Sequence, residues 1–274
     1  MLPASVADDP HAAVRRTSAV RFLYGLNPLA KMAAVLPALV LLVFVRDLAT
    51  PVAFLALSYL VLLVGVSLSI RAAVLLALAI PGAIAVLGFG FALWTDAALV
   101  ADTPPVLQIG AWTLYSGALE IGLATGLRLA AILALSLIPG LSTTGPDLVR
   151  ACVQQLRVPY RIGYTALAAF RFVPRFGHEL EIIRQAHRVR GAHRGRGPIA
   201  SLRRWASYLV PLLAGAIRHA ERVALAMDSR AFGAYPDRTE RHLVPFRARD
   251  VVFIAAFWLA SAALFALFFP WGIA

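Results

Sequence analysis

Two short arginine-containing motifs, Val189-Arg190-Gly191 and Ser229-Arg230-Ala231, are the residues best suited to chemistry with a partner. A guanidinium group is planar and always charged, so it can donate two parallel hydrogen bonds to one carboxylate. A small neighbour such as Gly191 or Ala231 lets a partner's backbone approach the arginine. The same arginines could instead reach toward anionic lipid headgroups, as interfacial arginines commonly do. Residue type and spacing do not by themselves distinguish these two uses.

Each arginine ends a segment that has the periodicity of an amphipathic helix. In both segments apolar residues recur every three or four positions, which places them on one helical face. The first seam contains Phe172, Phe176, Leu180, Ile183 and His187 before Arg190, and the second contains Leu209, Leu213, Ala216, Ala220, Val223 and Met227 before Arg230. Pro174 and Pro211 are expected near the starts of these helices, where a missing N–H costs least. Gly191 is expected to cap the first helix, and residues 191–198 to form a turn between the two helices.

The rest of the chain has the composition of a membrane protein. Hydrophobic residues make up 60% of the 274 positions, charged residues make up 15%, and the mean hydropathy is +0.77. A soluble domain of this length could not cover its surface with so little charge. Stretches that approach or exceed the roughly 20 apolar residues of a membrane-spanning helix run over residues 26–45, 48–70, 72–94, 112–138 and 251–274. The sequence therefore predicts an all-α fold: a polytopic helical membrane protein with about five transmembrane helices and a large region of amphipathic helices.

Charge is concentrated in one region, and its sign predicts an orientation. Residues 143–250 hold 19 of the 26 Lys and Arg and 8 of the 14 Asp and Glu, so they carry +11 of the net +12. Because basic loops stay on the cytoplasmic side, we expect this region and the N-terminus to be cytoplasmic in a cell-membrane protein. The predicted organisation is a cytoplasmic tail over residues 1–25, four transmembrane helices over 26–142, a cytoplasmic helical region over 143–249 and a last transmembrane helix over 250–274.

The sequence offers few groups for catalysis or cofactor binding. Lys31 is the only lysine, and no Gly-x-x-x-x-Gly-Lys-Ser/Thr loop is present to hold the phosphates of a nucleotide. Cys152 is the only cysteine and the six histidines lack the spacing of metal ligands, so we predict no metal site and no catalytic residue. Arg128 lies inside the fourth predicted span, where a charge is costly, and is therefore a candidate functional group. Alternatively, Arg128 bonds carbonyls or an acidic group on a neighbouring helix, while Glu120 lies at the outer interface.

Motifs along most of the chain, from about residue 26 onward, are shared with one known family. They are Leu26-Asn27-Pro28 followed by Lys31, Thr143-Thr144-Gly145-Pro146-Asp147-Leu148, Val158-Pro159-Tyr160, Phe170-Arg171-Phe172-Val173-Pro174, Glu179 through Gly191, and Pro211-Leu212-Leu213 through Phe232-Gly233. In these motifs the chain resembles the transmembrane T component of energy-coupling factor (ECF) transporters, the EcfT and CbiQ group. The likeness is most specific between residues 143 and 233.

The resemblance implies a non-catalytic coupling subunit of an ATP-driven importer. In that family the T component joins two cytoplasmic ABC ATPase subunits to a membrane S component, which captures a vitamin or a metal ion. Two Ala-Arg-Gly-type motifs end the coupling helices, and their arginines dock in grooves of the ATPases. By position these motifs are Val189-Arg190-Gly191, which has Val for Ala, and Ser229-Arg230-Ala231, which has Ser for Ala and Ala for Gly. The resemblance also implies that ATP and Mg are bound by the partner subunits and not by this chain.

Two other classes of membrane protein stay open at this point. An intramembrane lipid-modifying enzyme would also be polytopic with a basic cytoplasmic loop, but it would need clustered carboxylates or a nucleophile with a base. A stand-alone secondary carrier would place polar groups at the middle of several spans, where Arg128 is almost alone. Nucleic acid is not an expected partner, because His193-Arg194-Gly195-Arg196 has no aromatic platform and membrane lipid accounts for its charge.

Overall fold

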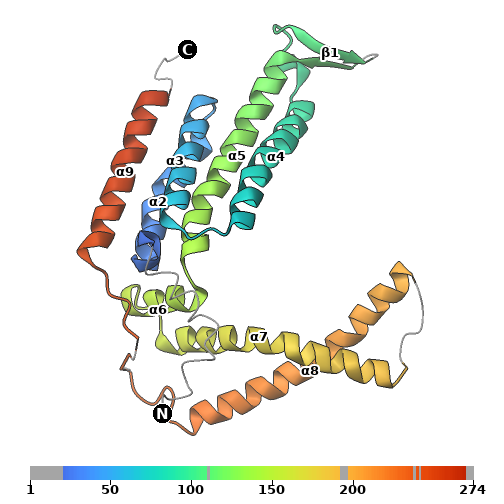
Figure 1. The fold of residues 1–274 in the computed structure, drawn as a ribbon, viewed down its shortest axis with the longest axis vertical. Helices are drawn as coiled ribbons and strands as arrows, with labels where there is room; N and C mark the ends of the chain where they lie inside the picture. Colours follow the sequence, from blue (N-terminus) through green and yellow to red (C-terminus); the bar gives the residue numbers. More distant parts are fainter. Residues whose placement is uncertain (1–20, 110–111, 192–196, 237–238, 241, 270–274) are drawn as a thin grey trace. The chain divides into compact units, whose positions relative to one another are not determined.

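The computed structural model describes residues 21–109, 112–191, 197–236, 239–240 and 242–269. They form two compact units (Figure 1). The membrane unit contains the chain up to Thr144 and from Pro245 onward, and the crossed-helix unit contains Gly145–Val244. Residues 1–20 of the predicted tail, 192–196 of the predicted turn and 270–274 of the last predicted span lie outside the described residues.

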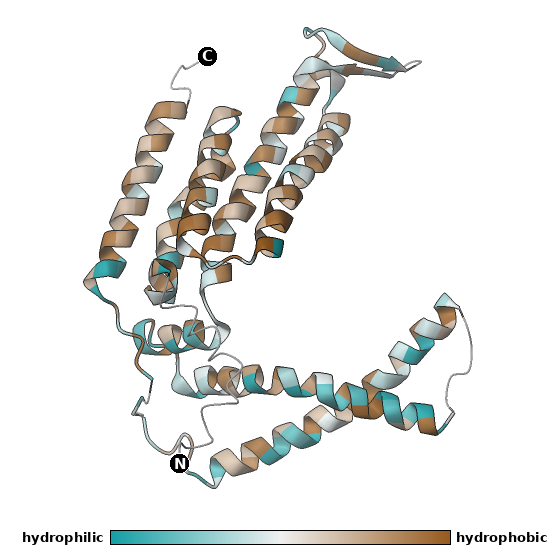
Figure 2. Ribbon diagram, viewed as in Figure 1, coloured by the Kyte–Doolittle hydropathy of each residue, from teal (hydrophilic) through white to brown (hydrophobic). Residues whose placement is uncertain are grey.

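The membrane unit consists of apolar helices. By length and composition α4, α5 and α9 can cross a membrane, and α2 and α3 are apolar helices of 17 residues, at the lower limit for a span. The bounds are α2 Pro28–Phe44, α3 Ala49–Gly65, α4 Ile70–Trp94, α5 Ser116–Ser142 and α9 Ala248–Phe268. Figure 2 shows mainly hydrophobic residues along these helices. The prediction of a polytopic helical membrane protein is confirmed.

A short β-hairpin separates α4 from α5, where we expected a loop followed by the start of a helix. Strand β1 (Pro105–Ile109) pairs antiparallel with strand β2 (Trp112–Tyr115), with Leu107 opposite Leu114. Helix α5 consequently begins at Ser116, and the predicted start at Trp112 is wrong. Branched and aromatic residues favour strands, so the first residues of the predicted span, Trp112–Tyr115, form β2 instead of the first turn of a helix.

Glycines bring α4 and α5 into close contact. A Cβ added at Gly122 of α5 would lie 2.2 Å from the carbonyl oxygen of Gly88 in α4, and one added at Gly126 would lie 2.9 Å from the backbone nitrogen of Gly88. No side chain fits at such distances. Close backbone approach through small residues is typical of helix pairs in membranes, where lipid is as apolar as the side chains and packing provides the attraction.

Two buried charged side chains tie the first turn of α2 to the ends of other helices in the membrane unit. Lys31 is 1% exposed, and its Nζ donates a hydrogen bond of 2.8 Å to the carbonyl oxygen of Ser142, the last residue of α5. Asp250 is also 1% exposed and accepts hydrogen bonds of 2.7 Å from the backbone N–H groups of Asn27 and Arg247. A buried charge is costly unless it is hydrogen-bonded, so these bonds stabilise the end of α5 and the start of α9.

The crossed-helix unit contains α6 (Gly145–Gln155), α7 (Tyr160–Val189) and α8 (Pro198–Asp228). Helices α7 and α8 run in opposite directions and cross (Figure 1). The side chains that meet at the crossing are mainly aromatic and basic. They are Phe172 stacked on His219 with ring centroids 4.4 Å apart, His187 edge-on to Tyr208 at 5.2 Å, and the Arg184 guanidinium 5.1 Å from the Trp205 ring centroid.

Pro174 and Pro211 lie inside α7 and α8, and the prediction that they lie near the helix starts is wrong. The helices begin at Tyr160 and Pro198 and are 30 and 31 residues long. An internal proline removes one backbone hydrogen bond and costs about 3 kcal/mol in a helix. Packing around the crossing offsets this cost, because Phe172 packs against Phe176 on the packed side of α7 and stacks on His219 of α8.

We predict that Gly122→Ala destabilises the membrane unit by about 1–3 kcal/mol, because the added methyl group overpacks the α4–α5 contact. Thermal unfolding of the detergent-solubilised protein measures the change. Gly140→Ala is the matched control on the same helix, since a Cβ there has no neighbouring atom within 4 Å. Equal unfolding temperatures for the two variants would contradict the close contact.

We predict that Asp250→Ala destabilises the protein by about 2–6 kcal/mol, since two backbone N–H groups lose their acceptor at a cost of about 1–3 kcal/mol each. Asp250→Asn keeps one side-chain carbonyl oxygen and should lose about half as much. Unfolding in a denaturant series compares the three proteins. A loss in Asp250→Asn as large as that in Asp250→Ala would show that charge, and not the pair of hydrogen bonds, matters at this position.

Candidate partner-docking site

The two arginine motifs lie at the C-terminal ends of α7 and α8. Because these helices cross in opposite directions, their C-terminal ends lie at opposite ends of the crossed pair (Figure 1). The structure therefore does not bring Arg190 and Arg230 together. It places each one at a separate tip of the same unit.

The first tip ends in a glycine cap, as predicted. The Arg190 N–H donates to the Ala186 carbonyl oxygen at 3.1 Å, the Gly191 N–H donates to the Arg188 carbonyl oxygen at 3.0 Å, and Gly191 has a φ of +64°. Val189 is 89% exposed, and the Arg190 side chain is exposed without a hydrogen bond or ion pair to any described residue. The guanidinium is thus available to a partner.

The second tip has the same backbone geometry without the glycine. The Phe232 N–H donates to the Met227 carbonyl oxygen at 3.0 Å, which closes a Schellman-type cap, and Ala231 takes the left-handed conformation with a φ of +55°. The Ser229 hydroxyl donates to the Ala226 carbonyl oxygen at 3.1 Å, so Ser is accommodated at this position. Arg230 is exposed and makes no hydrogen bond or ion pair within the part of the chain that the structure describes.

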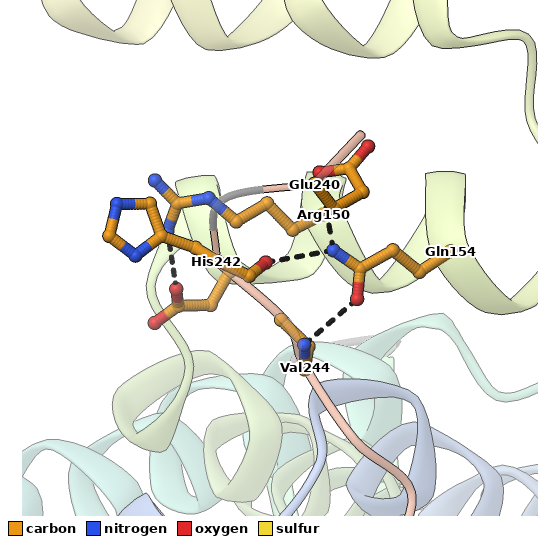
Figure 3. A network of polar contacts seen from close by, with 6 residues as sticks. Arg150, Gln154, Glu240, His242 and Val244 are labelled. Carbon is orange, nitrogen blue, oxygen red and sulfur yellow. Dashed lines mark hydrogen bonds and ion pairs between the residues drawn. The ribbon is translucent and has the colours of Figure 1, made fainter. Parts of the chain in front are cut away.

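After the second tip, the chain returns to α6 and the start of α7. We call residues 231–244 the return segment. Its polar contacts with α6 are seen in Figure 3. The Gln154 side chain donates to the His242 carbonyl oxygen and accepts from the Val244 N–H, both at 2.8 Å, and the Gln155 side chain donates to the Val244 carbonyl oxygen at 2.8 Å. These bonds hold the end of the return segment along α6.

The same figure also shows an ion pair between two residues of α6. The Arg150 guanidinium lies 2.9 Å from the Asp147 carboxylate, one helical turn earlier. Asp147 is in the first turn of α6, where a negative charge is favoured by the helix dipole. Glu240 of the return segment accepts from the Gln154 side chain at 3.4 Å.

The face of α7 that packs is the predicted one. Its predicted seam residues are all half-buried: Phe172, Phe176, Leu180, Ile183 and His187. The predicted seam of α8 is only partly packed: Ala216, Val223 and Met227 are half-buried, whereas Leu209, Leu213 and Ala220 are exposed. The packed face of α8 also passes through Tyr208, Gly215 and His219. Arg230 lies beyond the last residue of α8, so its place at the tip does not depend on which face is packed.

Arg128 lies near the middle of α5 and is half-buried. Its Nε is buried without a hydrogen-bond partner among the described residues, so the expected bond to a carbonyl or an acidic group is not seen there. Glu120 is exposed and lies in the second turn of α5, close in sequence to the hairpin. The described residues include no group of three or more His, Cys, Asp and Glu side chains that could hold a metal ion.

The residues that our sequence reasoning missed are those that fasten the return segment. Phe232, Tyr160 and Tyr164 form an aromatic cluster, in which Phe232 comes from the end of the second motif and the tyrosines from the start of α7. Tyr160 and Phe232 did fall within the motifs that resemble the family, but the periodicity of neither helix marks them. Their contact joins residues far apart in the sequence, which a local pattern does not reveal.

The fold and the site define a multi-pass helical membrane protein that carries a separate unit of two crossed helices with exposed arginine tips. Residues 19–241 match the family described as CbiQ, cobalt transport protein. The chain belongs to this family.

Known relatives agree with this membership. The energy-coupling factor transporter transmembrane protein EcfT of Bacillus subtilis is 26% identical over 174 residues, covering 61% of this chain and 66% of that protein. EcfT of Staphylococcus aureus is 31% identical over 160 residues, covering 56% of this chain and 59% of that protein. In Bifidobacterium longum, a protein named as an ABC transporter ATP-binding protein is 29% identical over 178 residues, which are 62% of this chain and 23% of that protein. The chain thus spans less than two thirds of the length of each of these relatives.

We predict that Ala231→Gly stabilises the second tip by up to about 1 kcal/mol, because glycine adopts a positive φ without the steric cost that alanine meets there. Gly191→Ala should destabilise the first tip by about 1 kcal/mol for the same reason. Gly177→Ala, inside α7 with open space around its Cβ, is the control and should be neutral or stabilising. Hydrogen exchange of the last turns of α7 and α8 reports each tip separately. Faster exchange in Ala231→Gly would contradict the prediction.

Proposed function

We propose that this chain is the transmembrane coupling component of an energy-coupling factor importer for a vitamin or a metal ion. Two ABC ATPase subunits dock on its arginine tips, and a membrane S component supplies the substrate. The observation that carries the proposal is the pair of exposed arginines at opposite ends of crossed helices, in a multi-pass membrane chain of the CbiQ family.

The geometry of the tips suits docking into two separate grooves. Each guanidinium stands at the end of a helix and has no hydrogen bond or ion pair to another described residue, so a carboxylate of a partner can accept two parallel hydrogen bonds from it. Because Arg190 and Arg230 lie at opposite ends of the crossed pair, two partner subunits can bind at once without competing. The relative in Bifidobacterium longum supports an ATPase partner, since a protein named as ATP-binding contains a stretch similar to this membrane chain.

The apolar face of α8 that α7 leaves uncovered suits a hydrophobic membrane partner. Leu209, Leu213 and Ile217 are each more than half exposed in the isolated chain. Large exposed apolar patches mark interaction sites. In a transporter of this family the S component is the partner of that chemistry, and membrane lipid covers the apolar surface of the membrane unit.

The orientation follows from charge. With the basic region over 143–249 and the N-terminus on the cytoplasmic side of the cell membrane, both arginine tips are on the side where ATP is available. The ATPase subunits bind ATP and Mg and hydrolyse ATP. This chain takes no part in the chemistry, and its crossed helices pass the movement of the ATPases to the S component as a shift of packed helices.

We predict that affinity purification of the tagged chain from its own cell in mild detergent recovers two ABC ATPase subunits and a small hydrophobic membrane protein. Arg190→Glu with Arg230→Glu should leave membrane insertion intact but weaken ATPase binding at least about 30-fold and abolish ATP-driven uptake. Loss of a buried charge pair costs about 2–5 kcal/mol, and the glutamates add repulsion from the partner's carboxylates.

Arg175→Glu with Arg222→Glu is the matched control, because it makes the same charge change at exposed positions of α7 and α8 away from the tips. The control should keep its ATPases. An equal loss in the control would show that net charge alone holds the complex. Purification of the chain as a lone species active in transport would overturn the proposed function.

A further inference from the structure

The two docking tips differ in what surrounds them. At the second tip the Phe232 ring packs against two tyrosines at the start of α7. Its centroid lies 5.7 Å from that of Tyr160 at an interplanar angle of 79°, and 6.4 Å from that of Tyr164 at 69°. Both are edge-to-face contacts, which aromatic rings favour. Arg230 is only two residues before Phe232, so this cluster holds the end of α8 against the first turns of α7.

Hydrogen bonds on either side of Phe232 reinforce the cluster. The Arg161 guanidinium donates to the Gly233 carbonyl oxygen at 2.5 Å, and the Tyr160 hydroxyl donates to the Tyr235 carbonyl oxygen at 2.6 Å. Gly233 has a φ of +88°, and a Cβ there would lie 3.0 Å from the Arg161 Nε, so the arginine approaches the backbone as closely as a glycine permits.

The Tyr164 hydroxyl donates to the Glu240 carboxylate at 2.7 Å further along the return segment. Successive turns at the start of α7 thus each bind the segment that follows Arg230. At the first tip the bonds of Arg190 and Gly191 to described residues are backbone bonds within the last turn of α7.

We propose that Phe232 is the positioning residue of the second docking motif: held between Tyr160 and Tyr164, it fixes Arg230 against the start of α7. The ATPase at this tip therefore meets a preorganised surface built from two helices, whereas at Arg190 the described residues form the tip of one helix. This inference rests on the proposed function. Fixing the backbone beforehand reduces the ordering cost of binding, so loss of Phe232 should weaken docking at Arg230 alone.

The test is a double-mutant cycle on the full-length chain in detergent or nanodiscs. The probe is the pair of ATPase subunits that copurifies with the wild-type protein, and the readout is their affinity. Phe232→Ala should weaken binding about 3- to 10-fold, the range expected for loss of aromatic contacts. Phe232→Ala should weaken ATPase binding little further in the Arg230→Glu background, because docking at that tip is already lost. In the Arg190→Glu background, Phe232→Ala should weaken ATPase binding by the same factor as in the wild type.

Three controls separate positioning from general damage. Phe232→Tyr keeps the ring and should restore binding. Tyr235→Ala removes an exposed ring from the same segment but keeps the backbone carbonyl, so it should bind like the wild type. The penalty of Arg190→Glu should persist in Phe232→Ala, which an unfolded crossed-helix unit could not show.

The outcomes distinguish the inference from the proposed function. If Phe232→Ala costs as much in the Arg230→Glu background as in the wild type, or has no effect, the positioning role is wrong and the docking role stands. If neither Arg190→Glu nor Arg230→Glu changes ATPase binding, the docking role and the inference both fall.

Discussion

Lys31 and Asp250 are two buried charges that bind the ends of α5 and α9 to the start of α2 within the membrane unit. The chain leaves the membrane unit just after Ser142, which Lys31 binds, and re-enters it just before Arg247, whose N–H binds Asp250. Asn27, four residues from Lys31, donates to the same Asp250. The first turn of α2 therefore binds the chain next to both points where it leaves and re-enters the membrane unit. Apolar packing in lipid is non-directional, so buried polar bonds are what can fix these points in one place.

In the crossed-helix unit, the C-terminal caps of α7 and α8 determine where Arg190 and Arg230 lie. Both end with the residue after arginine in the left-handed conformation, although only Gly191 suits that conformation without strain. The second tip has Ala231 at the same place and has the Phe232 cluster next to it. A less favourable cap and an aromatic contact to α7 thus occur together at the second tip.

Helix α8 shows why apolar residues alone do not identify a packing face. Its apolar side chains occupy more than one face of the helix. The packed face includes the half-buried Tyr208 and His219, whereas Leu209 and Leu213 are exposed. Hydropathy records which side chains avoid water but not which neighbour covers them. In the proposed transporter, exposed apolar residues such as Leu209 and Leu213 contact a surface that the chain itself does not supply. The predicted seam mixed these two groups.

The sequence by itself determined the class of membrane protein, most of its helices and the places where Arg190 and Arg230 occur at helix ends, because composition, helical periodicity and the glycine after Arg190 act over a few neighbouring residues. Local signals also misled, as when Pro174 and Pro211 suggested helix starts inside continuous helices. The tertiary structure alone decided the packed face of α8, the return of Phe232 to Tyr160, and the bonds of Lys31 to Ser142 and of Asp250 to Asn27. Each joins residues dozens to hundreds of positions apart, and such contacts depend on which segments the completed fold brings together.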